Sequence, residues 1–459
     1  MSRSACLPMI RPTVSSPIAS EDLSRPSPSR WDNMVEIHPR LRRDLEFIPV
    51  LQGSNQFVLI RDPLGLVPEG RALPAPLYSL AILLDGSRSL RDVQMLLMRQ
   101  QGGTLVSLDQ VESLLGELES AFILDSEAFR REEARIIREF SELSVRPCSH
   151  CGASYPKEPS ALSDMLSGIM AGADFSEADT QTPLALVAPH IDISVGAKAY
   201  ARAYGLLKGA TPSRVLIMGV GHQMRDALFS LTEKDFETPL GTVVCDRELV
   251  RELREAGGPL VAAHDFHHRA EHSIEFQVLF LQHVLGGGTF RIVPILCGPL
   301  QATPTPYSRD GFLELAQGFL SVLREVLRKD GPRTLPVAGV DLCHVGPKFG
   351  HEVAAQSLEE HARHHDETLL DALCRLDPDA FWAESTRVED RFNVCGFGAL
   401  ACLLEVLPPC RGTLLHYDMW HEEATRSAVS FAALGFSADR NQSLPPFRPP
   451  STTSRPGKN

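Results

Sequence analysis

Histidine and aspartate side chains follow three strongly apolar runs of the sequence. The run LALVAP leads into His190, RVLIMGVG leads into His222, and LPVAGV leads into Asp341, with His344 three residues further on. One histidine after a strand is most often a loop residue with an ordinary hydrogen bond. Parallel strands, however, deliver such side chains to one edge of a sheet, where α/β proteins bind their ligands. The repetition over three runs therefore favours a site for metal binding or proton transfer.

A cysteine lies just before another apolar segment, NVCGFGALACLLEVL, which has the composition of a buried helix. The positive end of that helix would lower the pKa of the Cys395 thiol toward the thiolate, the form that binds metal or attacks an electrophile. Gly396 would let the backbone approach a ligand closely. A small buried cysteine beside a tight turn explains the segment equally well when it is taken alone.

The segment AEHSIEFQVLFLQ carries three further titratable side chains at the start of an expected helix. Glu271 and Glu275 are one helical turn apart, and His272 and Glu275 are also near neighbours on the helix surface. The first-turn position of Glu271 and His272 directs them beyond the helix N-terminus. A helix that simply begins with a favourable acidic residue is the competing interpretation.

The elements that must position these residues alternate between strand and helix patterns. Continuous apolar runs predict strands at 184–189, 214–220, 290–298 and 335–340, and helices are expected at about 195–208, 272–285, 311–328 and 398–407. Such alternation is typical of a sheet covered by helices on both faces. We therefore predict an α/β domain over 183–440, with a mostly parallel central sheet flanked by helices.

The remainder of the chain separates by composition into four further regions. We expect disordered tails at 1–36 and 441–459, a small α+β domain at 37–143, and a linker at 144–182. The linker contains Cys148 and Cys151, but a single CxxC is a weak signal because a structural zinc site needs four ligands. A mobile linker is favoured there over a redox or metal site. The histidine-rich run HARHHDE is expected to form a solvated helix face.

The overall composition excludes some classes of function. The 459 residues include 45 Lys and Arg against 58 Asp and Glu, a formal charge of −13, which makes nucleic acid an unexpected partner. The sequence has no run of eighteen apolar residues, so we expect no membrane span. Its N-terminal residues have no apolar stretch typical of a secretory signal. The ten cysteines are scattered, as is typical of free thiols in a reducing compartment. We expect a cytoplasmic protein.

Six short motifs together resemble the Memo family. They are APH (188–190), GVGH (219–222), TPLG (238–241), EHSIEFQ (271–277), VDLCH (340–344) and VCG (394–396). Their order and spacing over about 250 residues are similar to that family, which is also met as protein B of the AmmeMemoRadiSam system. The family in turn resembles class III extradiol dioxygenases in fold and in the position of its pocket.

The resemblance implies specific roles for the residues found above. The implied metal ligands are His190, His222 and Cys395. The residues implied to line the pocket, as acid–base or supporting groups, are Asp341, His344, Glu271 and His272. Two imidazoles and one thiolate would leave a coordination position open, which marks a reactive site. A divalent ion is expected, Fe(II) first, with copper and zinc as alternatives.

The sequence also departs from the family pattern. IDISVG follows the first histidine where many members carry small or aromatic residues, Leu279 replaces a usual proline, and Val340 replaces a usual serine. None of these changes a proposed ligand. We expect them to change the shape of the pocket, so the substrate of other family members does not transfer directly to this chain.

The N-terminal run LLDGSRSLRDVQMLLMRQQGG with VESLLGELESAFIL resembles PqqD-like, winged-helix-like peptide-recognition domains. Such a domain would bind an extended peptide by strand addition; a helical accessory domain for dimerisation is an equal alternative. The complete resemblance implies a metal-dependent oxidoreductase-like protein that acts with a radical-SAM enzyme and its associated components. The alternatives are a non-catalytic metal-handling protein and a scaffold that binds peptides or a partner.

Overall fold

The chain folds as two compact units, Met1–Arg138 and Glu139–Asn459. The computed structural model describes residues 38–52, 55–68, 70–172, 182–225, 227–300 and 307–438. The tails expected at 1–36 and 441–459 lie outside these residues. Each unit has an apolar core of its own, and in the larger unit this core supports the candidate site.

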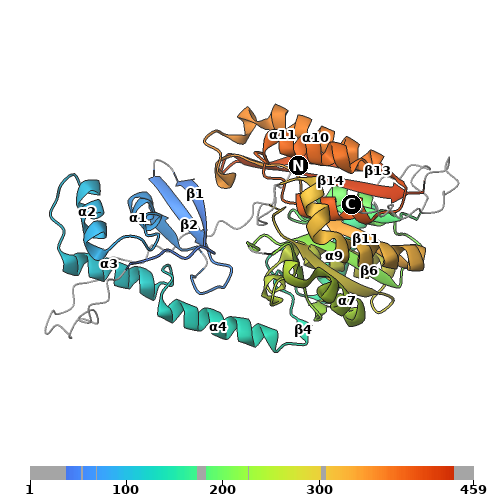
Figure 1. Ribbon diagram of the computed structural model, residues 1–459, viewed down its shortest axis with the longest axis horizontal. Helices are drawn as coiled ribbons and strands as arrows, with labels where there is room; N and C mark the ends of the chain where they lie inside the picture. The colour runs from blue at the N-terminus through green and yellow to red at the C-terminus, as the bar shows by residue number, and fades with distance from the viewer. Residues whose placement is uncertain are drawn as a thin grey trace, which may run out of the picture. The chain divides into compact units, whose positions relative to one another are not determined.

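The smaller unit combines an antiparallel sheet with helices. The sheet has the order β1 (Glu46–Gln52), β2 (Asn55–Arg61), β3 (Ala72–Pro74). The helices are α1 (Ala75–Ala81), α2 (Leu90–Gln100), α3 (Leu108–Ser120) and α4 (Glu127–Ser141), which runs across the division between the units (Figure 1). Ser89 and Ser107 cap α2 and α3 through reciprocal capping boxes, because each hydroxyl satisfies a free amide of the first turn.

The larger unit is built on an eight-stranded mixed sheet among the described residues. Its parallel centre has the order β5 (Ala185–Ala188), β11 (Thr334–Gly339), β6 (Arg214–Val220), β10 (Arg291–Cys297). Antiparallel strands extend it at both sides: β7 (Phe229–Leu231) beyond β10, and β14 (Ser427–Ser437), β12 (His344–Val345) and β13 (Arg411–Glu422) beyond β5. The α/β prediction is confirmed, with the parallel pairing confined to the centre.

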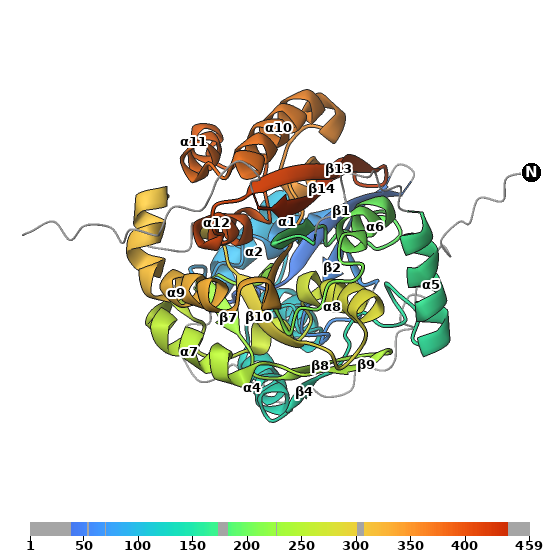
Figure 2. The same ribbon diagram turned by 90° about the vertical axis from the view of Figure 1, so that its right-hand side faces the viewer.

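Helices cover both faces of this sheet (Figure 2). One face carries α7 (Arg247–Gly257), α9 (Arg309–Asp330) and α12 (Phe397–Val406), and the other carries α5 (Pro159–Ala171), α6 (Ala197–Gly205) and α8 (His272–Leu285). Each face of the sheet has its own apolar core: the first core lies under α7, α9 and α12, and the second lies under α5, α6 and α8. Alternate residues of β6 contribute to the two cores, since Leu216 belongs to the first and Ile217 to the second. The helices α10 (Glu359–Arg375) and α11 (Pro378–Val388) add to the first core.

The segment expected to be a linker is a packed part of the larger unit as far as it is described. β4 (Val145–Arg146) pairs with β8 (Asp235–Thr238), which pairs with β9 (Gly241–Val243). Leu162 and Leu166, one turn apart on α5, are fully buried. Because these apolar side chains pack into the core, this part of the segment is a helix of the domain and not a mobile linker. Cys148 and Cys151 form a disulfide there, whereas we expected free thiols.

The histidine-rich run in α10 is also more buried than expected. His361 and His364 are exposed, but His365 and Asp366 are buried. His365 contacts Glu384 at 2.7 Å, and Tyr417 donates a hydrogen bond to Asp366 at 2.8 Å. The helix therefore has one solvated and one packed face. Its polar composition had predicted only the solvated face.

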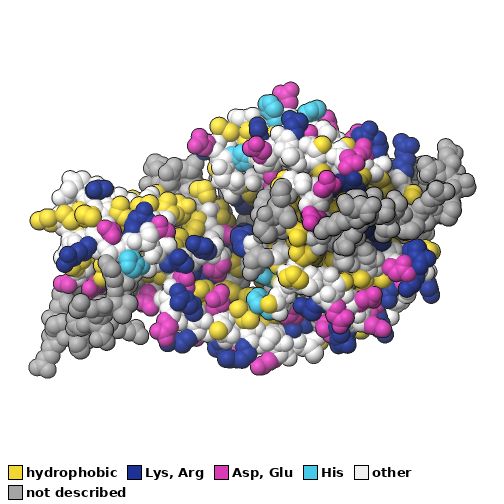
Figure 3. Space-filling model, viewed as in Figure 1, with side chains coloured by type: hydrophobic (Ala, Val, Ile, Leu, Met, Phe, Trp, Pro, Cys, Tyr) yellow, Lys and Arg dark blue, Asp and Glu magenta, His cyan; other side chains and the backbone are white. Residues whose placement is uncertain are grey.

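The surface carries mixed charges. On the face seen in Figure 3, Lys and Arg side chains are interspersed with Asp and Glu side chains. Along the described chain, no helix combines the length and apolarity needed to cross a bilayer.

Candidate metal centre

Three segments bring two imidazoles and a thiol together at the carboxyl edge of the parallel strands. His190 follows β5, His222 follows β6, and Cys395 lies just before α12. Their ligand atoms all lie within 4.8 Å of one another. The Cys395 Sγ atom is 3.5 Å from Nε2 of His190. The three residues that the resemblance implies as ligands are therefore close enough to hold one ion.

Both imidazole rings are fixed by hydrogen bonds through Nδ1. His190 Nδ1 donates to the Gly339 carbonyl at 3.0 Å. His222 Nδ1 donates to the Glu271 carboxylate, 3.0 and 3.1 Å from its two oxygens. These bonds leave Nε2 of each ring available to an ion, and metal-binding histidines are usually oriented in this way. The donor set therefore fits a divalent metal.

Without a metal ion, the electrostatics of the site favour a Cys395 thiolate between protonated His190 and His222 rings. Burial would lower the pKa of His190, but Asp341 and Cys395 raise it to about 9. The pKa of His222 is raised well above its usual range, because Glu271 and Cys395 outweigh burial. Burial would raise the pKa of Cys395, but His190 and His222 lower it. A cation bound here would replace these imidazole protons.

Glu271 and His272 extend the cluster from the N-terminus of α8. The ring of His272 stacks on His222 at 5.1 Å between centroids and meets the His190 ring edge-on at 5.1 Å. Burial, with the neighbouring imidazoles, lowers the pKa of His272 well below its usual range, so this ring is neutral. Glu271 also caps α8 by accepting from the Ser273 amide at 3.0 Å. His222, Glu271 and His272 form a second group with metal-binding geometry.

Asp341 supports His190. Its Oδ1 accepts the backbone amides of His190 at 3.0 Å and Ile191 at 3.2 Å, and its Oδ2 lies 3.5 Å from Nε2 of His190. This carboxylate therefore holds the chain that follows β5. Burial raises the pKa of Asp341, and the neighbouring histidine opposes that rise.

A cavity of about 470 Å³ opens beside the cluster. Its lining includes His222, Cys395, His344, Asn393, Phe349 and Arg225. His344 Nδ1 donates to the Leu342 carbonyl at 2.9 Å, which leaves Nε2 as the acceptor of the ring. Burial lowers the pKa of His344 to about 3, so the ring is neutral. The cavity gives a small molecule access to the thiol and to two imidazoles.

Gly396 lies against the chain that follows β11. A Cβ atom there would lie 2.5 Å from Val340 Cβ and 2.8 Å from the Asp341 carbonyl oxygen. The missing side chain thus permits close approach to the chain that follows β11. The Gly396 amide donates to that carbonyl at 3.2 Å, which brings Cys395 to the site.

Sequence reasoning missed several residues of the site. Asp390 and Asn393 line the cavity immediately before Cys395, and their polar run EDRFN was a usable signal. Glu275 was grouped with Glu271, but it points instead to Arg146 and Tyr155 in the segment before β5. Partners separated by more than a hundred residues give no local signal.

Comparison with known proteins identifies the family of the chain. The family model described as Memo-like protein matches residues 146–435, which include every predicted site residue. A MEMO1 family protein from Aquifex aeolicus is 26% identical over 403 residues, covering 86% of this chain and 100% of that protein.

Two further relatives show how widely the likeness extends. A MEMO1 family protein from Thermus thermophilus is 29% identical over 356 residues, covering 76% of this chain and 98% of its own. A memo-1 homolog from Caenorhabditis elegans is 26% identical over 310 residues, covering 63% and 81%. Since the family model spans well over half of the chain, from Arg146 to Gly435, the protein belongs to the Memo-like family.

Proposed function

We propose that this protein is a metal-dependent, oxidoreductase-like enzyme whose ion is held by His190, His222 and Cys395. The proposal depends on one observation: the ligand atoms of these residues lie within 4.8 Å of one another. Three protein ligands leave a coordination position for a reactant, as in catalytic rather than structural metal sites. Fe(II) is the first choice, with copper or zinc as alternatives, because imidazole and thiolate suit all three.

The bound ion would supply Lewis acidity and, as iron or copper, one-electron chemistry. The chain supplies orientation and hydrogen bonding. Glu271 holds His222 by its Nδ1, and Asp341 holds the backbone at His190. We assign His344 as a neutral hydrogen-bond acceptor for a bound molecule at Nε2, because its Nδ1 is already committed, the ring lines the cavity, and its low pKa makes it a weak base. His272, neutral beside both imidazoles, packs against them and fixes their positions.

The cavity favours turnover over the two alternatives. A metal-handling protein needs ligands but no adjoining space, whereas about 470 Å³ is enough for a small organic molecule. A scaffold without metal chemistry would need neither the aligned imidazoles nor the thiolate.

Anaerobic purification followed by elemental analysis tests the proposal first. We expect about one divalent ion per chain after loading with Fe(II), and then oxygen consumption when candidate small molecules are added. Stoichiometric metal without any consumption or product would favour the metal-handling alternative. An absence of metal after loading with iron, copper and zinc in turn would favour the scaffold.

The partner is also part of the proposal. The resemblance to AmmeMemoRadiSam protein B implies joint action with a radical-SAM enzyme and its associated components. Co-purification of the tagged full chain with that enzyme, both produced anaerobically, tests the association. A matched variant of the pocket, such as His344→Ala, should keep the association if the contact surface lies elsewhere.

The smaller unit has a specific feature that favours peptide binding. Within the described residues, β1 pairs only with β2, so one side of β1 can accept an extended peptide by strand addition. Isotope-labelled full chain titrated with candidate peptides should show shifts in the backbone amides of Glu46–Gln52 other than Pro49, which has none. Concentration-dependent dimerisation with the same shifts, and no response to peptide, would support the accessory-domain alternative.

A further inference from the structure

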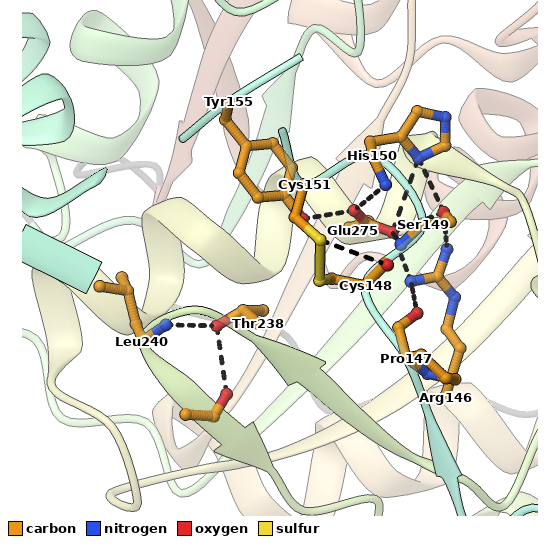
Figure 4. Close-up of a disulfide and its surroundings, with 11 residues drawn as sticks. Arg146, Pro147, Cys148, Ser149, His150, Cys151, Tyr155, Thr238, Leu240 and Glu275 are labelled. Atoms are coloured by element: carbon orange, nitrogen blue, oxygen red, sulfur yellow. Dashed lines mark hydrogen bonds and ion pairs between the residues drawn. A yellow bond between two sulfur atoms is a disulfide. The ribbon is translucent and has the colours of Figure 1, made fainter. Parts of the chain in front are cut away.

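The segment between β4 and α5 encloses a buried carboxylate. Glu275 is inaccessible to solvent, and Arg146, Ser149, His150 and Tyr155 converge on it (Figure 4). Arg146, also fully buried, pairs with Glu275 and donates to the Glu271 carbonyl at 2.8 Å. The segment is thus attached to α8 at the turn that carries Glu271 and His272.

Two of these contacts come from inside a disulfide ring. Cys148 and Cys151 are bonded and enclose Ser149 and His150. The Ser149 amide donates to Glu275 at 3.1 Å and the His150 amide donates at 2.9 Å. Since both amides must point the same way to reach one carboxylate, the conformation of the ring determines whether these bonds form.

The ring also reaches the metal centre through one side chain. The imidazole of His150 lies 5.5 Å from that of His272, centroid to centroid. His272 in turn lies 5.1 Å from His190 and 5.1 Å from His222. Only one imidazole ring therefore separates the disulfide-bonded loop from two of the proposed ligands.

The disulfide is placed where a thiol can reach it. Cys148 and Cys151 are half-buried, whereas Cys245, Cys297 and Cys402 are buried in the cores. Cys374 and Cys410 have similar exposure but are free thiols. Cys395, also half-buried, belongs to the site itself, so the bonded pair combines partial exposure with a position beside the site.

We infer that Cys148 and Cys151 form a thiol–disulfide exchange site whose oxidation state controls the neighbouring metal centre. The reaction partner is a dithiol, either a small molecule or a protein. Its thiolate attacks one sulfur of the Cys148–Cys151 bond and forms a mixed disulfide, and its second thiol then releases the dithiol of this chain. Two electrons and two protons pass to this protein, and the partner leaves as a disulfide.

Oxidation and reduction should have opposite effects on the centre. The disulfide fixes the amides of Ser149 and His150 on Glu275, and with them the His150 ring beside His272. Reduction frees the four-residue ring, so the support of His272 loosens. The coupling to the metal centre depends on the proposed function, whereas the exchange reaction does not.

The first experiment examines exchange alone, in the metal-free full chain without denaturant. Dithiothreitol should make Cys148 and Cys151 reactive to iodoacetamide, as read by peptide mass mapping, and oxidised dithiothreitol should reverse this. Hydrogen exchange at the Ser149 and His150 amides should accelerate in the reduced form. A pair that stays bonded in dithiol, or stays reduced in oxidised dithiothreitol, would overturn the exchange site.

The second experiment uses Co²⁺ as the metal probe, after the reductant has been removed by anaerobic gel filtration. We expect Co²⁺ to dissociate at least about fivefold more readily from the reduced form, the lower end for coupled sites. The Cys148→Ser/Cys151→Ser variant should match the reduced wild type under all conditions. The Cys374→Ser/Cys410→Ser variant, which removes two free thiols of similar exposure, should respond as the wild type does.

The two proposals can fail separately. Equal Co²⁺ affinity in both oxidation states would overturn the coupling and leave the metal site intact. If neither form bound Co²⁺, the metal proposal and the coupling would both be wrong, while thiol mapping and hydrogen exchange would still decide whether the pair exchanges.

Discussion

Each proposed ligand contacts a second group of the chain. The Gly339 carbonyl holds His190, the Glu271 carboxylate holds His222, and the Asp341 carbonyl lies 3.6 Å from the Cys395 sulfur. Such outer contacts fix ring orientation and tautomer before an ion arrives. These contacts therefore orient the proposed ligands in addition to packing.

Removal of any one ligand should therefore abolish tight binding. We expect His190→Ala, His222→Ala and Cys395→Ala each to lower metal affinity by more than the 10- to 100-fold typical of losing an outer contact. Elemental analysis after dialysis against a weak chelator measures the effect. His283→Ala and Cys410→Ala remove an imidazole and a thiol outside the cluster and should retain full metal content. Three ligand variants that all kept full stoichiometry would refute the assignment.

Metal affinity should rise with pH. The pKa of His190 is raised from 6.5 to about 9, and that of His222 is raised as well. Each ring must lose its proton to bind, so protons compete with the ion below the raised pKa values and cease to compete above them. Cys395, whose pKa is lowered, limits binding less. Zn²⁺ titrations between pH 6.5 and 9 should show affinity rising by up to about tenfold per pH unit for each proton displaced. An affinity independent of pH over this window would contradict the protonation pattern.

The sequence predicts those residues of the site that directly follow an apolar strand. His190, His222 and Asp341 follow apolar strands, and the edge of a parallel sheet gathers them without further information. The pairing of Arg146 with Glu275 could not be predicted, because the two residues are 129 positions apart and Arg146 lies in a strand of only two residues.

At the scale of elements, the central strands were predictable because continuous apolar runs leave few alternatives to a buried strand. The hairpin β13–β14 was not predicted. β14 is buried along nearly its whole length, yet SAVSFAALGFS is rich in alanine and serine rather than in strand-forming residues. Helix α5 was missed because its apolar stretch is short, contains Gly168 and follows the Pro- and Gly-containing run RPCSHCGASYPKEP.

The approach of α12 to β11 depends on Gly396. The Gly396→Ala variant would place Cβ against Val340 and the Asp341 carbonyl, so we expect a loss of about 1–3 kcal/mol in the free energy of unfolding together with weaker metal binding. Chemical denaturation measures the first and metal titration the second. As a control, Gly168→Ala in α5 meets no atom within 4 Å and should be neutral or stabilise by up to about 1 kcal/mol.

The attachment of β4 to α8 depends on a buried ion pair. Arg146→Met would leave the Glu275 carboxylate buried without its cation, and we expect a loss of about 3–5 kcal/mol in unfolding free energy. The double variant Arg146→Met/Glu275→Gln removes the charge as well and should recover part of that loss. If the single and the double variant were equally stable, the pair would not be the source of the effect.

At the scale of the whole molecule, two compact units share one chain. The relative from Aquifex aeolicus aligns over 403 residues, more than the larger unit contains, so the likeness reaches into the smaller unit. The metal centre and its cavity are built entirely from the larger unit. The proposed chemistry therefore belongs to the larger unit.

X-ray absorption spectroscopy of the Zn²⁺-loaded full chain tests the central claim most directly, since it reports the atoms bound to the ion. We predict one sulfur at roughly 2.3 Å and two imidazole nitrogens at roughly 2.0–2.1 Å, with the sulfur signal lost in Cys395→Ala. A spectrum with no sulfur neighbour, or with the same sulfur signal in that variant, would contradict a centre formed by His190, His222 and Cys395.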